Sequence, residues 1–370
     1  MPANNRTMGA VMSRGTLRRR GDRSWELKFD VGRDPATGRR VTKYRSVRGN
    51  KKDAQRELNR LLTQVDAGEF VDPAKITVAE YLDKWLDHAA TTVSAKTLER
   101  YRELARLHIK PHLGAMQLAR VRPLHIQDAW TKLLTNGRRD GAGLSPRTVH
   151  HVHRLLSTAL AQAVKWEMLP RNPATAVDPP KPEAHEIEIL GDDEVATLLA
   201  TVGNTWMYAP ILVAVTTGLR RGELLGLRWQ DVDLSAGRLS VVQSLEQTKA
   251  GLRLKPPKTK RSRRTITLPQ VTIDTLRQHW KDQAEQRLML GTGVRDSGLV
   301  FRQLDGSSHV PERFSKSFTH YVEQAGIARV SLHALRHTHV SQLLRSGVHP
   351  KVASERAGHA SVSITLDTYS

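Results

Sequence analysis

Two segments in the C-terminal half place arginine and histidine at spacings that suit contact with a phosphate group. Arg220 lies near the predicted start of one helix, and Glu223 follows one turn later on the same face. Further along, His333, Arg336 and His337 share one face of a second predicted helix. A guanidinium group can donate two parallel hydrogen bonds to phosphate oxygens, and imidazole adds further donors. These residues therefore predict a site that binds a phosphate.

A third segment adds a histidine and a tyrosine. His359 follows Gly358 and precedes Tyr369 by ten positions. A phenol with a pKa of about 10 attacks poorly at neutral pH, unless cations stabilise the phenolate and a neighbouring group accepts its proton. Each segment alone is typical of an exposed basic helix face. The three together, ending in a lone tyrosine, favour a site that binds a phosphate.

A zinc site explains the histidine pair less well. His333 and His337 have the spacing of two ligands on a zinc-binding helix. However, Ala334 stands where such a helix has its catalytic glutamate, and Arg336 would place a positive charge beside the ion. The chain contains no cysteine, which excludes thiolate metal sites, disulfides and thiol nucleophiles. We expect no metal and no cofactor.

The composition points to a polyanionic partner. The 370 residues contain 58 Lys and Arg against 37 Asp and Glu, which gives a net charge of +21. Such an excess is typical of proteins that bind nucleic acid or an anionic membrane surface. No apolar run is long enough to span a membrane, and the first residues lack the apolar core of a signal peptide. We therefore expect a cytoplasmic protein with no membrane partner.

The first 60 residues form the most basic part of the chain, with 17 Lys and Arg against 6 Asp and Glu. Residues 25–31 and 41–47 alternate as half-buried strands do, residues 15–20 can add a third strand, and a helix is predicted after Asn50. A small basic sheet can lie on DNA, although a solvated basic face explains the pattern equally well. The candidate DNA contacts are Arg18, Arg19, Arg20, Lys28, Arg40, Lys43 and Arg45.

Residues 77–175 predict a helical bundle. Thr77 and Glu80 form a capping box, residues 118–134 are predicted as one helix, and Ser145 caps a long helix that ends near Pro170. The proline-rich residues 172–182 are interpreted as an interdomain linker. The remaining residues mix helices with a hairpin formed by residues 238–243 and 264–268. The fold class is thus a multi-domain α+β chain, mostly α with small β elements.

The three segments resemble the signatures of the tyrosine recombinases, the phage integrase family. The matching pieces are Thr217-Gly-Leu-Arg-Arg-Gly-Glu-Leu, His333-Ala-Leu-Arg-His-Thr, and Gly358-His359 followed by Tyr369. Their order and spacing agree with the family. The resemblance implies three domains: an arm-type DNA-binding domain (1–70), a helical SAM-like core-binding domain (77–175) and a mixed α/β catalytic domain (185–370). It also implies site-specific recombination that integrates, and in some cases excises, a mobile element such as a phage.

The same resemblance implies a role for each residue. Tyr369 would attack the scissile phosphate, forming a 3′-phosphotyrosyl bond and releasing a 5′-hydroxyl group. Arg220 and Arg336 would hold the phosphoryl oxygens. His333 would act as general base or as a donor to the phosphate, and His359 would be a further donor. No metal or ATP is required, because one phosphodiester bond is exchanged for another.

Residues 257–269 resemble the hairpin that delivers the family's catalytic lysine. Lys258 is assigned as the general acid, and Lys260 is its rival. Glu223 is expected to support Arg220, and His337 is expected to support the site or to pack behind it. The other basic side chains of this hairpin that are expected to contact DNA are Lys260, Arg261 and Arg263.

The resemblance also implies partners. These are double-stranded DNA at attachment sites, a homotetramer assembled on that DNA, and an accessory directionality factor. The chain stops at Ser370, one residue after the tyrosine, where the family continues into a segment that docks on a neighbour. We weighed two alternatives: a type IB topoisomerase-like enzyme that relaxes DNA, and a DNA-binding protein without enzymatic activity. Two separate basic modules favour the recombinase over the topoisomerase, and the intact catalytic set argues against a binding protein.

Overall fold

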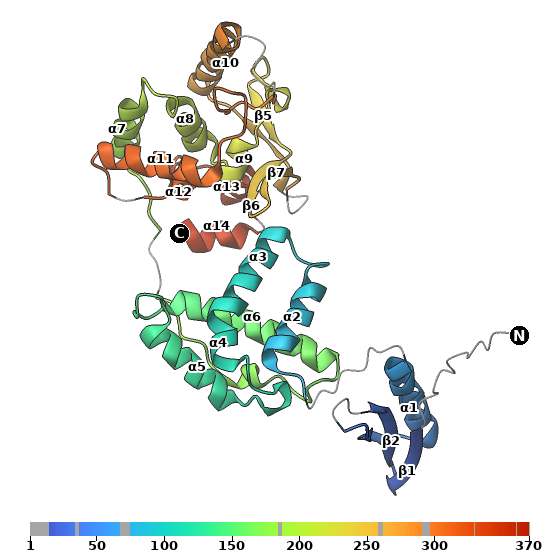
Figure 1. Ribbon diagram of the computed structural model, residues 1–370. Coiled ribbons are helices and arrows are strands. Elements are labelled where there is room, and N and C mark those ends of the chain that lie inside the picture. The colour runs from blue at the N-terminus through green and yellow to red at the C-terminus, as the bar shows by residue number, and fades with distance from the viewer. Residues whose placement is uncertain are drawn as a thin grey trace, which may run out of the picture. The chain divides into compact units, whose positions relative to one another are not determined.

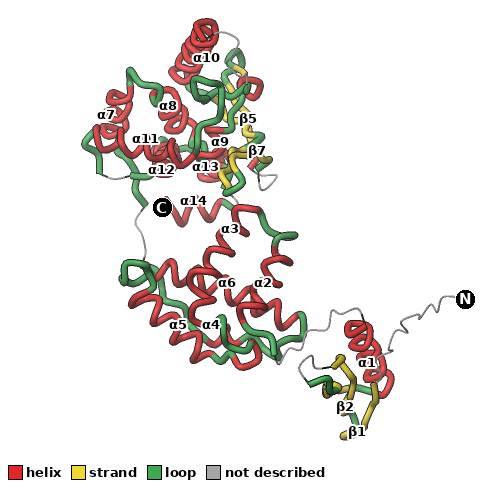
Figure 2. Tube along the Cα trace, in the orientation of Figure 1, coloured by secondary structure: helices red, strands yellow, loops and turns green. Residues whose placement is uncertain are grey.

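The computed structural model describes residues 15–33, 37–66, 75–183, 187–257, 262–290, 297–328, 330–359 and 361–369. The chain divides into two compact units (Figure 1). The first comprises residues 1–91 and 102–181, and the second comprises residues 92–101 and 182–370. Helices predominate, and the strands form small antiparallel sheets (Figure 2). The predicted α+β class is confirmed.

The first unit begins with a three-stranded sheet covered by one helix. Strands β1 (Gly15–Gly21), β2 (Ser24–Arg33) and β3 (Arg40–Arg48) pair in that order, and α1 (Lys51–Asp66) follows. Leu27 and Phe29 are buried against Leu58 of the helix, as the alternation in the sequence predicts. The side chain of Asn50 accepts a hydrogen bond from the backbone nitrogen of Asp53 and caps α1.

The rest of the first unit is helical. Its elements are α2 (Val78–Ala89), α3 (Ala95–Leu104), a π-helical turn (Ala105–Ile109), α4 (Lys110–Leu113), a 3₁₀ turn (Leu118–Arg120), α5 (Pro123–Asn136), α6 (Pro146–Lys165) and a 3₁₀ turn (Pro173–Ala176). Residues 95–101, the larger part of α3, are grouped with the second unit.

Two sequence interpretations in this unit are corrected. Residues 118–134 are not one helix, because the 3₁₀ turn ends before Pro123, which opens α5. The predicted linker 172–182 is also partly folded, since Pro173 and Ala174 are buried. Asn172 fixes this segment by donating a hydrogen bond to the carbonyl oxygen of Ser157 in α6.

The second unit contains the remaining elements. They are α7 (Asp192–Val202), α8 (Tyr208–Thr217), α9 (Arg221–Leu225), a 3₁₀ turn (Trp229–Asp231), β4 (Val232–Asp233), β5 (Arg238–Val241), β6 (Ser244–Thr248), β7 (Gly251–Lys255), β8 (Arg264–Thr267), α10 (Gln270–Leu290), α11 (Pro311–Gln324), α12 (Leu332–Arg345), α13 (Pro350–Ala357) and α14 (Val362–Tyr369).

One core holds this unit together. Strands β4, β5 and β8 form one sheet, and β6 and β7 form a separate hairpin. The predicted pairing of 238–243 with 264–268 is confirmed, because Leu239 pairs with Ile266. The buried face of α8, including Ile211 and Val213, packs in the same core as Phe314 of α11. Figure 1 shows α7, α8, α11 and α12 on one side of this unit and the strands on the other.

Among the helices of the described part of the chain, none combines the length and the apolar character needed to span a bilayer.

Candidate active site

Arg220 is fixed at the junction of α8 and α9. Gly218 ends α8 with a φ of +64°, a left-handed conformation that glycine adopts without strain. A Cβ atom at this position would also lie 2.8 Å from the ring of His339. Arg220 directly precedes α9, and its Nη2 donates to the carbonyl oxygen of Gly358 at 2.8 Å. This hydrogen bond joins the first predicted segment to the third.

Glu223 holds Arg220 in this position. One carboxylate oxygen accepts from Arg220 Nη1 at 2.9 Å, and the other accepts from the Arg220 backbone nitrogen at 3.0 Å. The Glu223 side chain is only 5% exposed. Burial raises the pKa of Glu223, but hydrogen bonds and the positive charges of Arg264 and Arg220 outweigh burial and hold the pKa below its ordinary value. This geometry suits a residue that supports Arg220 rather than one that contacts substrate.

The second segment lies on α12, as predicted. Ser331 precedes this helix, but its side chain makes no capping hydrogen bond. Arg336 is buried, and its Nη1 donates to the carbonyl oxygen of Gly218 at 2.8 Å. The rings of His333 and His337 meet edge to face with centroids 4.7 Å apart. Helix α12 therefore connects to the end of α8, next to Arg220.

Burial and positive neighbours keep these histidines neutral. Burial, followed by the charges of His337, Arg336 and Arg220, lowers the pKa of His333 to about 4. Burial also lowers the pKa of His337, with Arg336 as the second cause. A neutral imidazole has an unprotonated ring nitrogen, which a general base requires.

A cavity of about 780 Å³ opens beside these groups. Arg220, Glu223, His333, Gly358 and Lys255 all border it. The structure thus brings members of all three predicted segments to one cavity.

The third segment follows α13. Gly358 ends that helix with a φ of +68°, and His359 comes next. The Nδ1 atom of His359 lies 2.8 Å from the hydroxyl oxygen of Thr365. Burial lowers the pKa of His359 to about 4, and the charges of Arg336 and Arg220 contribute. His359 borders a second, smaller cavity of about 370 Å³ rather than the larger one.

Tyr369 is the last residue of α14, the helix that contains Thr365. The predicted nucleophile therefore belongs to the helix that hydrogen-bonds to His359. Its role remains a prediction.

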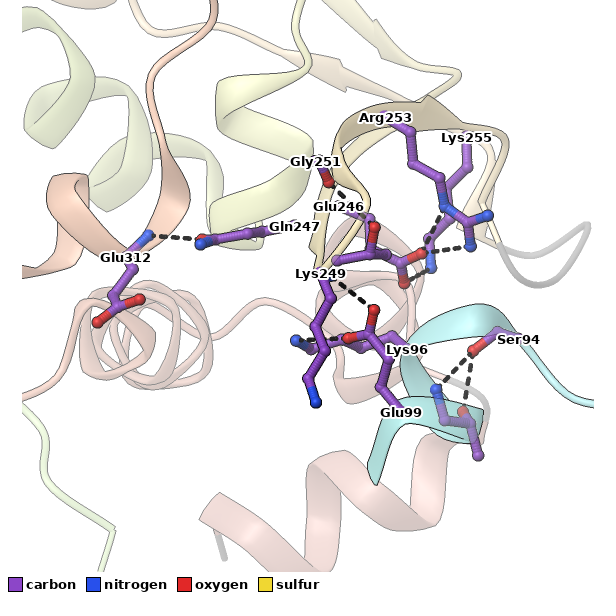
Figure 3. A network of polar contacts seen from close by, with 12 residues as sticks. Ser94, Lys96, Glu99, Glu246, Gln247, Lys249, Gly251, Arg253, Lys255 and Glu312 are labelled. Carbon is purple, nitrogen blue, oxygen red and sulfur yellow. Dashed lines mark hydrogen bonds and ion pairs between the residues drawn. The ribbon is translucent and has the colours of Figure 1, made fainter. Parts of the chain in front are cut away.

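The predicted lysine hairpin is described only in part. Lys258, Lys260 and Arg261 lie outside the described residues, and Arg263 is exposed. The strand before them ends at Lys255, which forms an ion pair with Glu246 of β6. Figure 3 shows this carboxylate facing both Lys255 and Arg253.

The turn between β6 and β7 makes a further contact within the second unit. The backbone nitrogen of Lys249 donates to Glu99 of α3 at 2.6 Å (Figure 3). Lys96 also forms an ion pair with Glu99 at 3.3 Å. A basic hairpin is therefore held at its turn by an acidic side chain.

The basic residues of the N-terminal sheet divide between its two faces. Lys28 lies on the face away from α1, beside the ring of Tyr44, and pairs across the strands with Thr16 and Tyr44. Several others form ion pairs with acidic side chains: Arg19 with Asp22, Arg20 with Glu26, Arg40 with Asp30, and Arg45 with Glu57 and Glu167. Arg18 is exposed, and Lys43 is half-buried. DNA contact by these residues remains a prediction.

Sequence reasoning missed three residues of the site: Lys255, Arg264 and Thr365. A signal for Arg264 existed, because it precedes the buried Ile266 and Leu268 by two and four positions and so shares their inward face. Thr365 had no local signal. Its hydrogen bond to His359 depends on how α14 folds back.

No group of three or more acidic or histidine side chains in the described ranges is arranged to hold a metal ion.

Two family models match this chain. The family model described as "Phage integrase family" matches residues 188–370, and the model described as "Phage integrase, N-terminal SAM-like domain" matches residues 77–134. A protein named "Tyrosine recombinase XerC-like" from Caldanaerobacter subterraneus is 30% identical, over 94% of this chain and 92% of the relative. An integrase of Streptomyces ambofaciens is 28% identical, over 93% of this chain and 88% of the relative.

Solved structures share the fold. The Tn1549 transposon integrase in complex with a circular intermediate DNA has a TM-score of 0.69 at 20% identity, over 80% of this chain and 95% of that chain. The lambda integrase tetramer bound to a Holliday junction has a TM-score of 0.61 at 18% identity, over 96% of this chain and 94% of that chain.

Proposed function

The chain belongs to the phage integrase family, and on that premise we propose that Tyr369 is the nucleophile with which it cleaves DNA. It is a site-specific recombinase of the tyrosine type, an enzyme that breaks and rejoins DNA, and DNA is its partner. The comparisons give no support to the topoisomerase alternative. The observation that carries the proposal is the gathering of Arg220, His333 and Gly358 around one cavity.

The reaction exchanges one phosphodiester bond for another. The phenolic oxygen of Tyr369 attacks the scissile phosphorus while the bond from phosphorus to the 5′-oxygen breaks. The phenolic proton goes to His333, and the leaving 5′-oxygen takes a proton from Lys258. A 5′-hydroxyl group of a second strand then attacks the 3′-phosphotyrosyl bond, and the same transfers run in reverse. Because bond energy is conserved, neither ATP nor a metal is needed.

The arginines stabilise the charge that builds on the phosphate. Arg220 borders the cavity with a partly exposed side chain, whereas Arg336 lies behind it against Gly218. Preorganised donors of this kind typically contribute about 10²- to 10³-fold to a rate.

His359 acts as a neutral donor. If the Thr365 hydroxyl donates to Nδ1 of His359, the ring proton resides on Nε2, which is then available to donate to the phosphate. The low pKa of His359 fits this role, because the ring needs no charge to donate.

We assign the domains as the sequence predicts: residues 1–70 bind arm-type sites, residues 77–175 bind the core site, and residues 185–370 catalyse strand exchange. Four copies act together on two duplexes, since a complete exchange breaks four strands and each break uses one tyrosine. The likeness in fold to a tetramer solved on a Holliday junction supports this assembly. An accessory protein sets the balance between integration and excision.

The test is covalent trapping. Nicked suicide duplexes tiled across the DNA that flanks the gene are incubated with the full chain, and adducts are mapped by mass spectrometry. We expect a 3′-phosphate esterified to Tyr369 at one core site, and no adduct with Tyr369→Phe at unchanged DNA affinity. An adduct that persists in this variant would remove Tyr369 from the mechanism. Efficient relaxation of supercoiled DNA that lacks the core site would favour a topoisomerase.

A further inference from the structure

Arg264 is a buried cation directly behind the candidate active site. It is the first residue of β8, and its side chain is only 6% exposed. It borders the smaller cavity beside His359, whereas the larger cavity is lined by Arg220. A guanidinium group this deeply buried is stable only if its donors are satisfied and its charge is balanced.

The donors of Arg264 reach three parts of the site. Nε donates to the carbonyl oxygen of Arg356 at the end of α13, at 2.7 Å. Nη2 donates to Glu223 at 2.8 Å, and Nη1 lies 3.3 Å from the other oxygen of the same carboxylate. Nη1 also donates to the carbonyl oxygen of Ser262. Arg264 therefore links β8, the carboxylate that holds Arg220, and the helix that precedes His359.

Gly358 allows this guanidinium group to lie close to the backbone. A Cβ atom at Gly358 would lie 3.1 Å from Nη1 of Arg264 and 3.2 Å from its Cδ. The carbonyl oxygen of the same glycine accepts from Arg220. Arg220 and Arg264 thus both hydrogen-bond to Glu223, and both lie close to the backbone of Gly358.

The charges of Arg220, Glu223 and Arg264 have a consequence for catalysis. If Glu223 were paired with Arg220 alone, the pair would be neutral, and Arg220 would present little positive charge to a phosphate. Arg264 shares the carboxylate, so the two guanidinium groups and Glu223 together carry a net charge of +1. Arg220 is 38% exposed and borders the larger cavity, whereas Arg264 is buried. The net charge is therefore presented on the cavity side.

We propose that Arg264 is a positioning residue that neutralises Glu223, so that Glu223 can orient Arg220 without cancelling the charge that Arg220 offers to the scissile phosphate. This inference rests on the proposed function. Arg264 does not touch DNA in this account and acts only through Glu223 and Arg220.

The test is a charge rescue in the full chain, with the nicked duplex that the unmodified enzyme traps. Arg264→Gln removes the charge, and we expect adduct formation to slow about 100-fold while DNA affinity changes little. Adding Glu223→Gln to Arg264→Gln removes the carboxylate that would cancel Arg220. We expect this double variant to recover at least about tenfold of the lost rate. Arg277→Gln, at an exposed position of α10 that borders neither cavity, is the matched control and should keep the unmodified rate.

A second readout separates charge from simple misfolding. A methylphosphonate at the scissile position carries no negative charge, so it depends less on a cation. Arg264→Gln should therefore slow this substrate less than about tenfold, relative to the unmodified enzyme on the same substrate. A purely structural defect would slow both substrates equally, and a melting curve of each variant reports folding directly.

The outcomes are distinguishable. If the unmodified enzyme forms no adduct with any duplex, the proposed function fails and this inference fails with it. If the unmodified enzyme forms the adduct but Arg264→Gln cleaves as fast, the inference alone is overturned. It is also overturned if the double variant is no faster than Arg264→Gln, or if both substrates slow equally.

Discussion

The Nδ1 atom of His359 and the hydroxyl oxygen of Thr365 lie 2.8 Å apart. This hydrogen bond connects the loop after α13 to α14, the helix that ends at Tyr369. Thr365 is fully buried, so its hydroxyl group has little access to water as an alternative partner. One side chain thus connects the predicted phosphate donor, His359, to the helix that ends at the predicted nucleophile.

Replacing Thr365 by valine tests that link. Valine keeps the shape but removes the hydroxyl group, so Nδ1 of His359 loses its partner and the ring is free to change tautomer or rotate. We expect adduct formation to slow about tenfold with unchanged DNA affinity. Thr365→Ser, which keeps the hydroxyl group, should retain most of the rate. Equal rates for Thr365→Val and the unmodified enzyme would show that the hydroxyl group does not orient His359.

Arg336 offers a separate test of the phosphate clamp. Arg336→Ala removes a buried cation and leaves the carbonyl oxygen of Gly218 without this donor. We expect cleavage to fall by about 10²- to 10³-fold and DNA affinity by far less, because Arg336 is one of 58 Lys and Arg residues on a chain with a net charge of +21. Arg345→Ala, at an exposed position of the same helix, is the control and should leave cleavage unchanged.

The comparison of binding with cleavage decides the role of Arg336. If its removal weakens binding and cleavage by the same factor, Arg336 contributes to general DNA affinity rather than to the reacting phosphate. Quantitative gel shifts and single-turnover trapping on the same duplex provide the two numbers.

Much of the fold could be predicted because the signals were local. Alternation placed Leu27 and Phe29 in the core of the first sheet, and the capping box of Thr77 and Glu80 forms as predicted, with the Thr77 nitrogen donating to Glu80 at 2.8 Å. The prediction of one helix over 118–134 was wrong, because it followed the apolar spacing and gave too little weight to Pro123, which interrupts a helix.

In the site, contacts within one helical turn could be predicted from the sequence, whereas contacts between distant segments could not. The spacing of Arg220 and Glu223 was sufficient to predict their contact, because both lie within one turn. The contact of Arg264 with Glu223 spans 41 positions, and that of Arg220 with Gly358 spans 138. Such contacts depend on how β8 and α13 pack against α9, and no period or cap in the sequence encodes that packing.

Salt dependence tests the N-terminal domain. If the sheet and α1 contact phosphates, binding of the chain without residues 1–70 releases fewer counterions from the DNA. The log–log slope of DNA affinity against salt concentration then becomes shallower. We expect a weaker slope with arm-site DNA and a smaller change with a core-only duplex. A slope that is unchanged on both duplexes would show that this domain does not touch DNA.

A more selective version uses the face of the sheet away from α1. Lys28→Gln with Arg18→Gln removes two exposed charges there, so the slope should fall by about 2. Arg19→Gln is the matched single control, because Arg19 forms an ion pair with Asp22 and contributes less to a phosphate contact.

The last prediction concerns pH and the buried His339 behind the site. Burial, followed by the charge of Arg356, lowers the pKa of His339 to about 4. His339 Nε2 accepts from Arg356 Nε at 3.1 Å. The unfolded chain therefore binds a proton at this histidine between about pH 4 and 6.5, whereas the folded chain does not. The free energy of unfolding should consequently rise with pH across that window. His339 contributes up to about 3 kcal/mol to this rise, and its contribution is lost as the pH falls. His333 and His359 contribute in the same direction.

His339→Gln removes one of the three groups, so urea unfolding midpoints of the variant should depend less on pH than those of the unmodified chain. Parallel curves for the two proteins would show that His339 titrates alike in the folded and unfolded states.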